Sequence, residues 1–357
     1  LQKAAGDRLR NILSAMTRNR FAGLLTGCAI TALIQSSSAS TVMVVSFVNA
    51  GLMSLAQSMA VIMGANVGTT FTAWIIAIFG FKVDISTFVL PLIGVAVVLL
   101  LMNKSKTKSI GEFLIGFSFL FMGLGLISDY VPDLQNNPEM FAVLRDYASG
   151  GIKSVLVFTL VGLVLTMVIQ SSAATFAITL IMCTKGWITF DLACALVLGS
   201  NIGTTITPIL ASLSGNVAAK RASMGHLLFN LLGTLWCLCV FIPFAEFNSW
   251  LTEAIGQGNP EALYGFVTNL EQTDPELYNH LFDNSLPAGH DVIRQIGNMQ
   301  MSVSFGLSIF HTTFNLVNVM VMIWLTKLYV KIVEWLVPSK NRDEEEFTLK
   351  FISGGLM

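Results

Sequence analysis

Two long stretches of this chain carry no charged side chain, and this feature constrains the fold more than any other. No Asp, Glu, Lys or Arg occurs between Arg20 and Lys82, and none occurs between Lys153 and Lys185. A helix of about 20 apolar residues is long enough to cross a lipid bilayer. Both stretches are longer, so each must cross and fold back, or cross in several pieces. The sequence therefore predicts an all-α integral membrane protein.

The composition favours the same class. Hydrophobic residues make up 54% of the 357 residues and charged residues only 11%, whereas a soluble domain has about 25% charged residues. The five cysteines lie in apolar segments and have no metal-finger spacing with the four histidines. We therefore expect no covalent cofactor and no nucleic acid partner, with the lipid bilayer as the main surroundings.

An internal repeat runs through the chain. Gln35-Ser-Ser-Ser and Gln170-Ser-Ser-Ala lie 135 residues apart, and Gly64-Ala-Asn-Val-Gly-Thr-Thr and Gly199-Ser-Asn-Ile-Gly-Thr-Thr have the same separation. No gap separates the two motifs in either copy. We interpret the two segments as copies of one structural unit.

The placement of Lys and Arg predicts the orientation, because short cytoplasmic loops carry an excess of both. Fifteen of the twenty Lys and Arg are cytoplasmic if the inside holds residues 1–20, Lys104 to Lys108, Lys220-Arg221 and the chain from Lys327 onward. The first hairpin then enters from the inside and the second from the outside. Such an inverted-topology repeat, with two re-entrant helical hairpins and interrupted transmembrane helices, is typical of secondary transporters.

The predicted elements follow from this threading. They are repeat 1 at 1–109 (hairpin 21–49, broken helix 54–79, helix 86–102), repeat 2 at 110–244 (helix 110–128, hairpin 154–184, broken helix 188–212, helix 222–244), an extracytoplasmic loop or cap at 245–303, a final transmembrane helix at 304–326, and a cytoplasmic amphipathic tail at 327–357.

The register of the repeat predicts one more helix, before Leu1. The apolar stretch from Gly111 to Tyr130 precedes the second hairpin, and its counterpart would lie upstream of the first residue. The alternative is that the first repeat lacks this helix.

The two Gln-Ser-Ser motifs lie in the middle of apolar runs, which predicts a turn at membrane depth. Irregular backbone is tolerated there only where it lines a polar cavity. Serine favours helix N-caps, and a helix that begins at each serine cluster directs free N–H groups and its positive dipole end at an anion. With no Lys or Arg at this depth, a bound anion needs a cation beside it. The alternative role is hydrogen bonding between helices.

The glycine motifs predict interruptions in the helices that follow the hairpins. Glycine allows unwinding or close approach, while Asn66, Asn201 and the neighbouring threonines offer ligands where helical hydrogen bonds are lost. Pro208 adds a further break in the second copy. The alternative is close packing of small residues between helices.

A third motif places ionisable groups inside apolar helices. His226-Leu-Leu-Phe-Asn230 and His311-Thr-Thr-Phe-Asn315 share one spacing. Intramembrane histidines are candidate proton sites, but we favour neutral side chains that support the transport core.

These motifs together resemble the type II sodium/phosphate cotransporter family, including its bacterial members, over about residues 1–335. The resemblance implies sodium-driven symport of inorganic phosphate by alternating access. It implies phosphate ligands at Gln35, Ser36, Ser37, Ser38, Gln170, Ser171, Ser172, Asn66 and Asn201. It implies sodium ligands at Gln35, Ser38, Thr69, Thr70, Gln170, Ser171, Thr204 and Thr205. Ala173 departs from the third serine of the pattern, so the second copy has one hydroxyl fewer.

The end of the chain carries a further resemblance. Asp343 to Phe351 is similar to the segment that leads into a cytosolic PhoU-like domain in some bacterial members. Such a domain is therefore an expected partner in the full-length chain. The sequence does not fix the oligomeric state.

Three other functions stay open. Another small oxyanion, such as arsenate or sulfate, could replace phosphate, because nothing in a neutral site selects phosphorus. A phosphate sensor without transport is a second alternative. An intramembrane enzyme is the least favoured, because neither hairpin has a base beside its serines.

Overall fold

The computed structural model describes residues 15–79, 85–102, 104–130, 151–282 and 291–339. In these segments the regular structure is entirely helical, which confirms the predicted all-α class. The helices are α2 (Arg20–Ile34), α3 (Ser37–Asn49), α4 (Leu55–Phe79), α5 (Ile85–Leu100), α6 (Ser105–Tyr130), α8 (Ile152–Ile169), α9 (Ser172–Thr184), α10 (Phe190–Gly203), α11 (Ile206–Ser212), α12 (Val217–Cys239), α13 (Phe241–Ala254), α14 (Ala262–Thr273), α15 (Pro275–Phe282), α16 (Asp291–Met322) and α17 (Thr326–Leu336).

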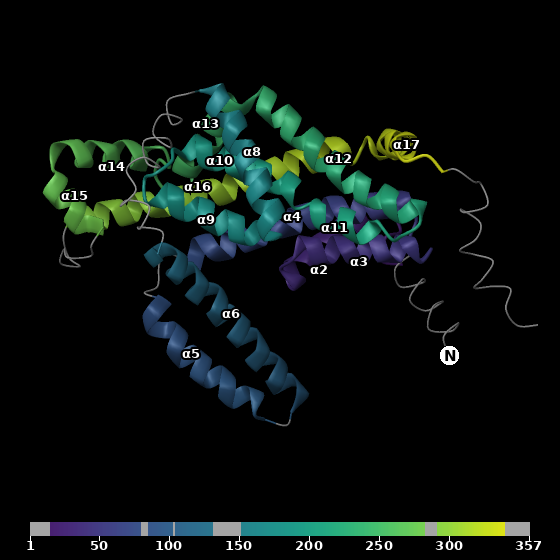
Figure 1. The fold of residues 1–357 in the computed structure, drawn as a ribbon, viewed down its shortest axis with the longest axis horizontal. Helices are drawn as coiled ribbons and strands as arrows, with labels where there is room; N and C mark the ends of the chain where they lie inside the picture. The colour runs from purple at the N-terminus through teal and green to yellow at the C-terminus, as the bar shows by residue number, and fades with distance from the viewer. Residues whose placement is uncertain (1–14, 80–84, 103, 131–150, 283–290, 340–357) are drawn as a thin grey trace, which may run out of the picture.

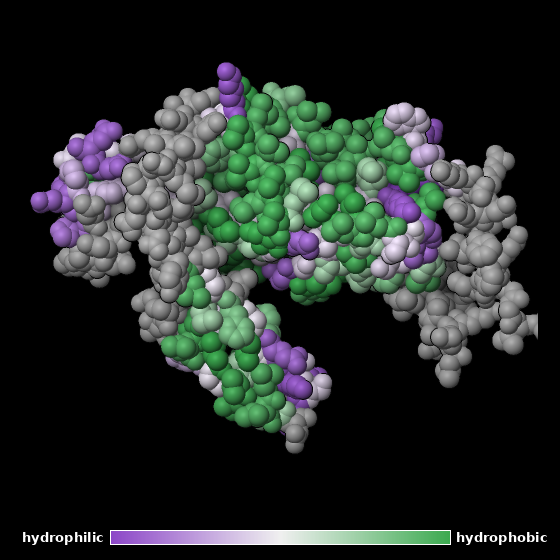
Figure 2. Space-filling view, viewed as in Figure 1, coloured by the Kyte–Doolittle hydropathy of each residue, from purple (hydrophilic) through white to green (hydrophobic). Residues whose placement is uncertain are grey.

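Several of these helices can span a bilayer. Among the described residues, five spans are long and apolar enough: Leu55–Ile78, Ile152–Ile169, Phe190–Ser212, Val217–Cys239 and Asp291–Met322. Figure 2 shows apolar residues over most of the main body and hydrophilic residues gathered near its two ends. The chain is therefore a multi-pass membrane protein.

Most helices form one elongated body, from which α5 and α6 project as a separate pair (Figure 1). The short helices α14 and α15 lie at one end of the body, and α17 lies toward the other. The largest core cluster consists mainly of buried apolar residues of α9, α10 and α16, joined by one or two residues each of α4, α5, α6, α8, α12, α13 and α14.

The two copies of the repeat pack their first and third helices in the same way. We call α2, α3 and α4 unit 1, and α8, α9, α10 and α11 unit 2. A Cβ atom added to Gly64 of α4 would lie 1.9 Å from the carbonyl oxygen of Leu24 in α2. The equivalent atom on Gly199 would lie 1.8 Å from that of Thr159 in α8. Both contacts require glycine, because the two backbones touch there.

The predicted helix breaks differ between the units. In unit 2 the helix is interrupted at Thr204 and Thr205, between α10 and α11, but α4 of unit 1 is continuous. The prediction of a broken helix at 54–79 is therefore wrong. Pro208, which lacks an N–H group, lies one turn after Thr204, while its counterpart 135 residues earlier is Ala73. The glycines of α4 serve close packing instead of unwinding.

The polar region after α12 is also more helical than expected from an extracytoplasmic loop. It contains α13, α14 and α15, and α16 begins at Asp291, ahead of the predicted start at 304. Ser302 of α16 donates hydrogen bonds to the carbonyl oxygens of Gln257 and Asn298, and the first of these ties α16 to the loop between α13 and α14. The early turns of α16 mix polar and apolar residues, so hydropathy alone did not predict a helix there.

The amphipathic segment near the C-terminus forms α17. Its buried face, Tyr329 and Val333, lies against α12, where the Tyr329 hydroxyl donates to the carbonyl oxygen of Gly225. Burial raises the pKa of that hydroxyl. The helix predicted before Leu1 and the PhoU-like lead-in at Asp343 to Phe351 lie outside the described residues.

Candidate functional site

Two tight turns of the same geometry join the first and second helices of each unit. Gln35 ends α2 with φ 58°, and Gln170 ends α8 with φ 57°; they are the non-glycine residues with positive φ in the described chain. Each glutamine N–H donates to a threonine carbonyl one turn back, Thr31 at 2.8 Å and Thr166 at 2.7 Å. A left-handed conformation is unusual for glutamine, so its presence in both copies indicates a structural constraint at this position.

A serine then starts the next helix in both units, as predicted. Ser36 caps α3, and its Oγ accepts from Ala39 N at 3.2 Å; Ser171 caps α9 and accepts from Ala174 N, also at 3.2 Å. The backbone N–H groups in the first turn of a helix have no hydrogen-bond acceptor within that helix. Each turn therefore presents backbone donors and serine hydroxyls at the positive end of a helix dipole.

The predicted threonine and asparagine ligands of the third helices also have equivalent bonds. Asn66 Nδ2 donates to Ile62 O at 2.9 Å, and Asn201 Nδ2 donates to Val197 O at 2.8 Å. The hydroxyls of the four threonines bond to carbonyls of their own helix turn: Thr69, Thr70, Thr204 and Thr205. In both asparagines the side-chain carbonyl oxygen takes no part in this bond to the helix backbone.

Two threonines that the sequence argument missed distinguish the units. Thr72 Oγ1 of α4 donates to Gln35 Oε1 at 3.0 Å, which ties the first turn to the third helix. Thr207, its counterpart in unit 2, has a buried hydroxyl with no hydrogen-bond partner. The 135-residue spacing of the repeat was the signal that could have identified this pair.

The histidine motifs lie in the buried core. His226 and Asn230 are fully buried on α12, and His311 and Asn315 are buried on α16. Each asparagine Nδ2 donates to the carbonyl oxygen of the histidine one turn before it, at 3.0 Å in α12 and 2.9 Å in α16. His311 Nε2 lies 3.4 Å from Asn201 Oδ1, so α16 reaches the predicted site of unit 2.

The predicted ligands therefore fall into two sets, one within each unit. In the described chain the two turns share no hydrogen bond, and no group of three or more His, Cys, Asp or Glu side chains could hold a metal ion. Both turns are made of uncharged groups. Hydroxyl, amide and carbonyl oxygens are hard donors, which suit an alkali cation, while the N–H groups suit an anion.

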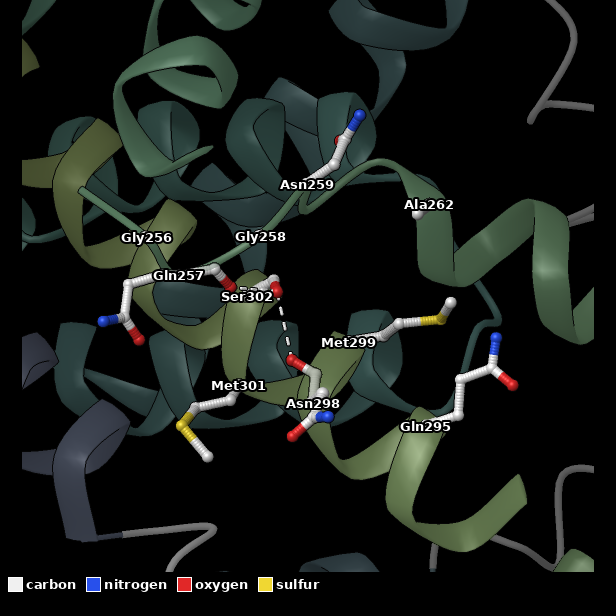
Figure 3. A pocket seen from close by; sticks show the side chains of 10 residues that line it. All are labelled: Gly256, Gln257, Gly258, Asn259, Ala262, Gln295, Asn298, Met299, Met301 and Ser302. Atoms are coloured by element: carbon white, nitrogen blue, oxygen red, sulfur yellow. Dashed lines mark hydrogen bonds between the residues drawn. The ribbon is translucent and has the colours of Figure 1, made fainter. Parts of the chain in front are cut away.

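A cavity of about 520 Å³ lies away from these turns, where the early part of α16 passes the loop between α13 and α14 (Figure 3). Amide and thioether side chains such as Gln257, Gln295, Asn298 and Met299 line it. It contains none of the predicted ligands.

A multi-pass helical protein with a duplicated turn of uncharged hydrogen-bonding groups between apolar helices has the features of a membrane transporter of small ions. The chain belongs to the Na+/Pi-cotransporter family, whose family model matches residues 1–129 and 139–250. This is a family of transporters, and its membership supports phosphate transport.

The proteins similar to this chain include two whose names refer to phosphate. The chain is 30% identical to the uncharacterized protein YqeW of Bacillus subtilis, over 94% of this chain and 91% of that protein. It is 29% identical to the YjbB protein of Escherichia coli, whose name proposes inorganic phosphate export, over 80% of this chain and 48% of that protein. A 76-residue stretch is 43% identical to sodium-dependent phosphate transport protein 2A of Ovis aries, covering 21% of this chain and 12% of that protein. No solved structure matches the chain. The chain thus spans about half the length of YjbB.

Proposed function

We propose that the protein is a secondary active symporter that couples uptake of inorganic phosphate to the entry of sodium. The observation that carries this proposal is the duplicated turn, in which a left-handed glutamine and a serine N-cap open a short helix in each unit. One such turn is a common way to end and restart a helix. Two with matching backbone angles, 135 residues apart, favour a shared binding task.

The anion site would be formed by both turns. Phosphate would accept hydrogen bonds from the serine hydroxyls and the first N–H groups of α3 and α9, where the helix dipoles favour negative charge. The ligands we propose are Gln35, Ser36, Ser37, Ser38, Asn66, Gln170, Ser171, Ser172 and Asn201.

Sodium would balance the anion. An unpaired charge in a low-dielectric site is costly, and neither turn has a basic residue in its charge-free stretch. The proposed sodium ligands are Gln35, Ser38, Thr69, Thr70, Gln170, Ser171, Thr204 and Thr205. Sodium and phosphate are therefore carried together as substrates.

Alternating access would arise from an inverted repeat, with the α2–α3 and α8–α9 pairs as re-entrant hairpins from opposite faces. The distribution of charge supports this orientation. Arg20 Nη1 donates to Ile323 O at 2.9 Å and Arg221 Nε donates to Val337 O at 3.0 Å, so each of these basic residues bonds to a residue that flanks α17. Asp191, Glu246 and Glu261 lie near one another elsewhere in the molecule. By the excess of Lys and Arg, the α17 end is cytoplasmic.

Transport by the purified chain in proteoliposomes tests the proposal. An inward sodium gradient should drive accumulation of labelled phosphate, and an equal potassium gradient should not. Uptake that does not respond to sodium would overturn the coupling. Stronger competition by arsenate or sulfate than by unlabelled phosphate would reassign the substrate.

Export is the second candidate, because the YjbB relatives carry that name. Vesicles loaded with phosphate distinguish the two directions. Release that exceeds uptake under the same inward sodium gradient would favour an exporter. Phosphate binding without flux in either direction would favour a sensor.

A further inference from the structure

The two buried histidines occupy equivalent places against the two units, although the 135-residue repeat does not relate α12 to α16. At the start of α12, Asn216 Nδ2 donates to the carbonyl oxygen of Asn49, the last residue of α3, at 2.9 Å. On α16, Gln300 Nε2 donates to the carbonyl oxygen of Thr184, the last residue of α9, at 3.1 Å. Thr184 is the repeat counterpart of Asn49. Each helix is thus attached to the same point of its unit.

A second set of buried residues shows the same correspondence between the two units. Ala222 of α12 lies in one buried cluster with Val45 of α3 and Ile62 of α4. In unit 2 the equivalent residues Leu180 and Val197 share a buried cluster with Leu307 of α16. Corresponding residues of the two units are thus buried together with α12 in unit 1 and with α16 in unit 2.

His226 and His311 lie one turn after Ala222 and Leu307 on α12 and α16. In unit 2, the His311 ring stacks on Phe176 of α9 with ring centroids 5.9 Å apart, and its Nε2 lies 3.4 Å from Asn201 Oδ1. His311 therefore lies between the second helix of the pair and the asparagine of the proposed site.

The same step in unit 1 leads from Ala222 to His226, from Ile62 to Asn66 and from Val45 to Thr41. Residues four apart lie on one face of a helix, so these three buried side chains continue the faces that carry Ala222, Ile62 and Val45, away from the Asn49–Asn216 contact. Thr41 and Asn66 are the repeat counterparts of Phe176 and Asn201.

In unit 1, however, these side chains make no hydrogen bond to one another. His226 has no hydrogen-bond partner at either ring nitrogen, and the buried hydroxyl of Thr41 has none. An unpaired buried polar group costs about 1–3 kcal/mol, and such groups in a native fold require an explanation.

We propose that His226 and His311 are equivalent positioning residues, one for each unit, and that they engage alternately. In the present structure His311 holds Asn201. When the transporter faces the other side of the membrane, a small shift of α12 against unit 1 brings His226 onto Asn66 and Thr41, and His311 releases Asn201. This inference rests on the proposed alternating-access function, and it assigns a role in the cycle to residues outside both turns.

Four variants of the full chain in proteoliposomes test it: His226→Leu, His311→Leu, His226→Gln and His311→Gln. One net hydrogen bond contributes about 0.5–1.5 kcal/mol, so each leucine variant should lower the maximal uptake rate by about two- to tenfold. Glutamine retains a side-chain donor and should restore at least half of the lost rate. Thr313→Val is the matched control, because it removes the α16 bond to Asn248 of α13 without touching either unit, and its rate should stay within about twofold.

The unpaired hydroxyl provides a second measurement. Thr41→Val should lower the maximal rate as His226→Leu does, and the double variant should be no slower than His226→Leu alone, because the two side chains share one contact. A normal rate in His226→Leu beside a reduced rate in His311→Leu would overturn the equivalence. So would a loss of rate that follows thermal unfolding and is not rescued by glutamine. Absence of sodium-driven uptake in the unmodified chain would instead contradict the proposed function.

Discussion

Units 1 and 2 have nearly identical turns but different connections. The N-cap serines have φ −145° and ψ 107° in unit 1 and φ −141° and ψ 108° in unit 2. In unit 1 the turn is tied to a continuous α4 by the Thr72–Gln35 bond, whereas in unit 2 the helix is broken and Thr207 is unpaired. The motif thus determines local geometry, and the surroundings determine which contacts are made.

The largest expected effect concerns the close helix crossing that the two units share. Gly64→Ala and Gly199→Ala should each place a methyl group against a backbone carbonyl, at 1.9 Å and 1.8 Å, which neither helix can relieve by a side-chain rotation. We expect a loss of more than about 3 kcal/mol in the free energy of unfolding, at the upper end for overpacked sites. Size-exclusion chromatography and thermal unfolding in detergent measure it.

Gly116→Ala on α6 is the control, because its Cβ would meet nothing within 4 Å. It should behave as the unmodified chain. If Gly64→Ala is folded while Gly199→Ala is not, the two helix crossings are not equivalent.

The next largest effect concerns the break in the third helix, which unit 2 has and unit 1 lacks. Ala73→Pro in unit 1 should remove a helical hydrogen bond within the continuous α4 at a buried residue, at a cost of about 3 kcal/mol. The reciprocal change Pro208→Ala should alter the free energy of unfolding by less than about 1 kcal/mol, because unit 2 already accommodates the break. A loss of about 3 kcal/mol in Pro208→Ala as well would contradict this, because it would show that the broken helix of unit 2 depends on its proline for stability.

The same residues show which features of the structure follow from the sequence and which do not. The charge-free runs, the 135-residue register and the serine N-caps all follow from composition and spacing. The continuity of α4 did not, because a glycine motif allows either unwinding or close packing, and only the neighbouring α2 decides between them. The left-handed glutamines have no local signal, since glutamine has no preference for positive φ. The Thr72–Gln35 bond depends on tertiary contact between residues 37 positions apart.

Transport tests whether the two turns act together. Ser37→Ala and Ser172→Ala remove one hydroxyl from the first turn of α3 and of α9. A hydrogen bond to a charged group contributes about 1.5–3 kcal/mol, so each change should lower sodium-driven phosphate uptake by about 10- to 100-fold with little change in thermal stability. Ser46→Ala, at an exposed position of α3, is the control. A normal rate in one of the two serine variants would limit the site to the other unit.

The smallest predicted effect separates the two threonines. Thr72→Val should cost about 1 kcal/mol, because it breaks the bond to Gln35 Oε1 and replaces the hydroxyl with a methyl group of similar size. Thr207→Val removes a buried hydroxyl that has no partner, so the free energy of unfolding should stay constant or rise slightly. Thermal unfolding of the two variants side by side measures the difference. If the transporter exchanges the roles of its units during transport, the order should reverse when the opposite-facing state is trapped, since Thr207 would then hold Gln170 as Thr72 holds Gln35 here.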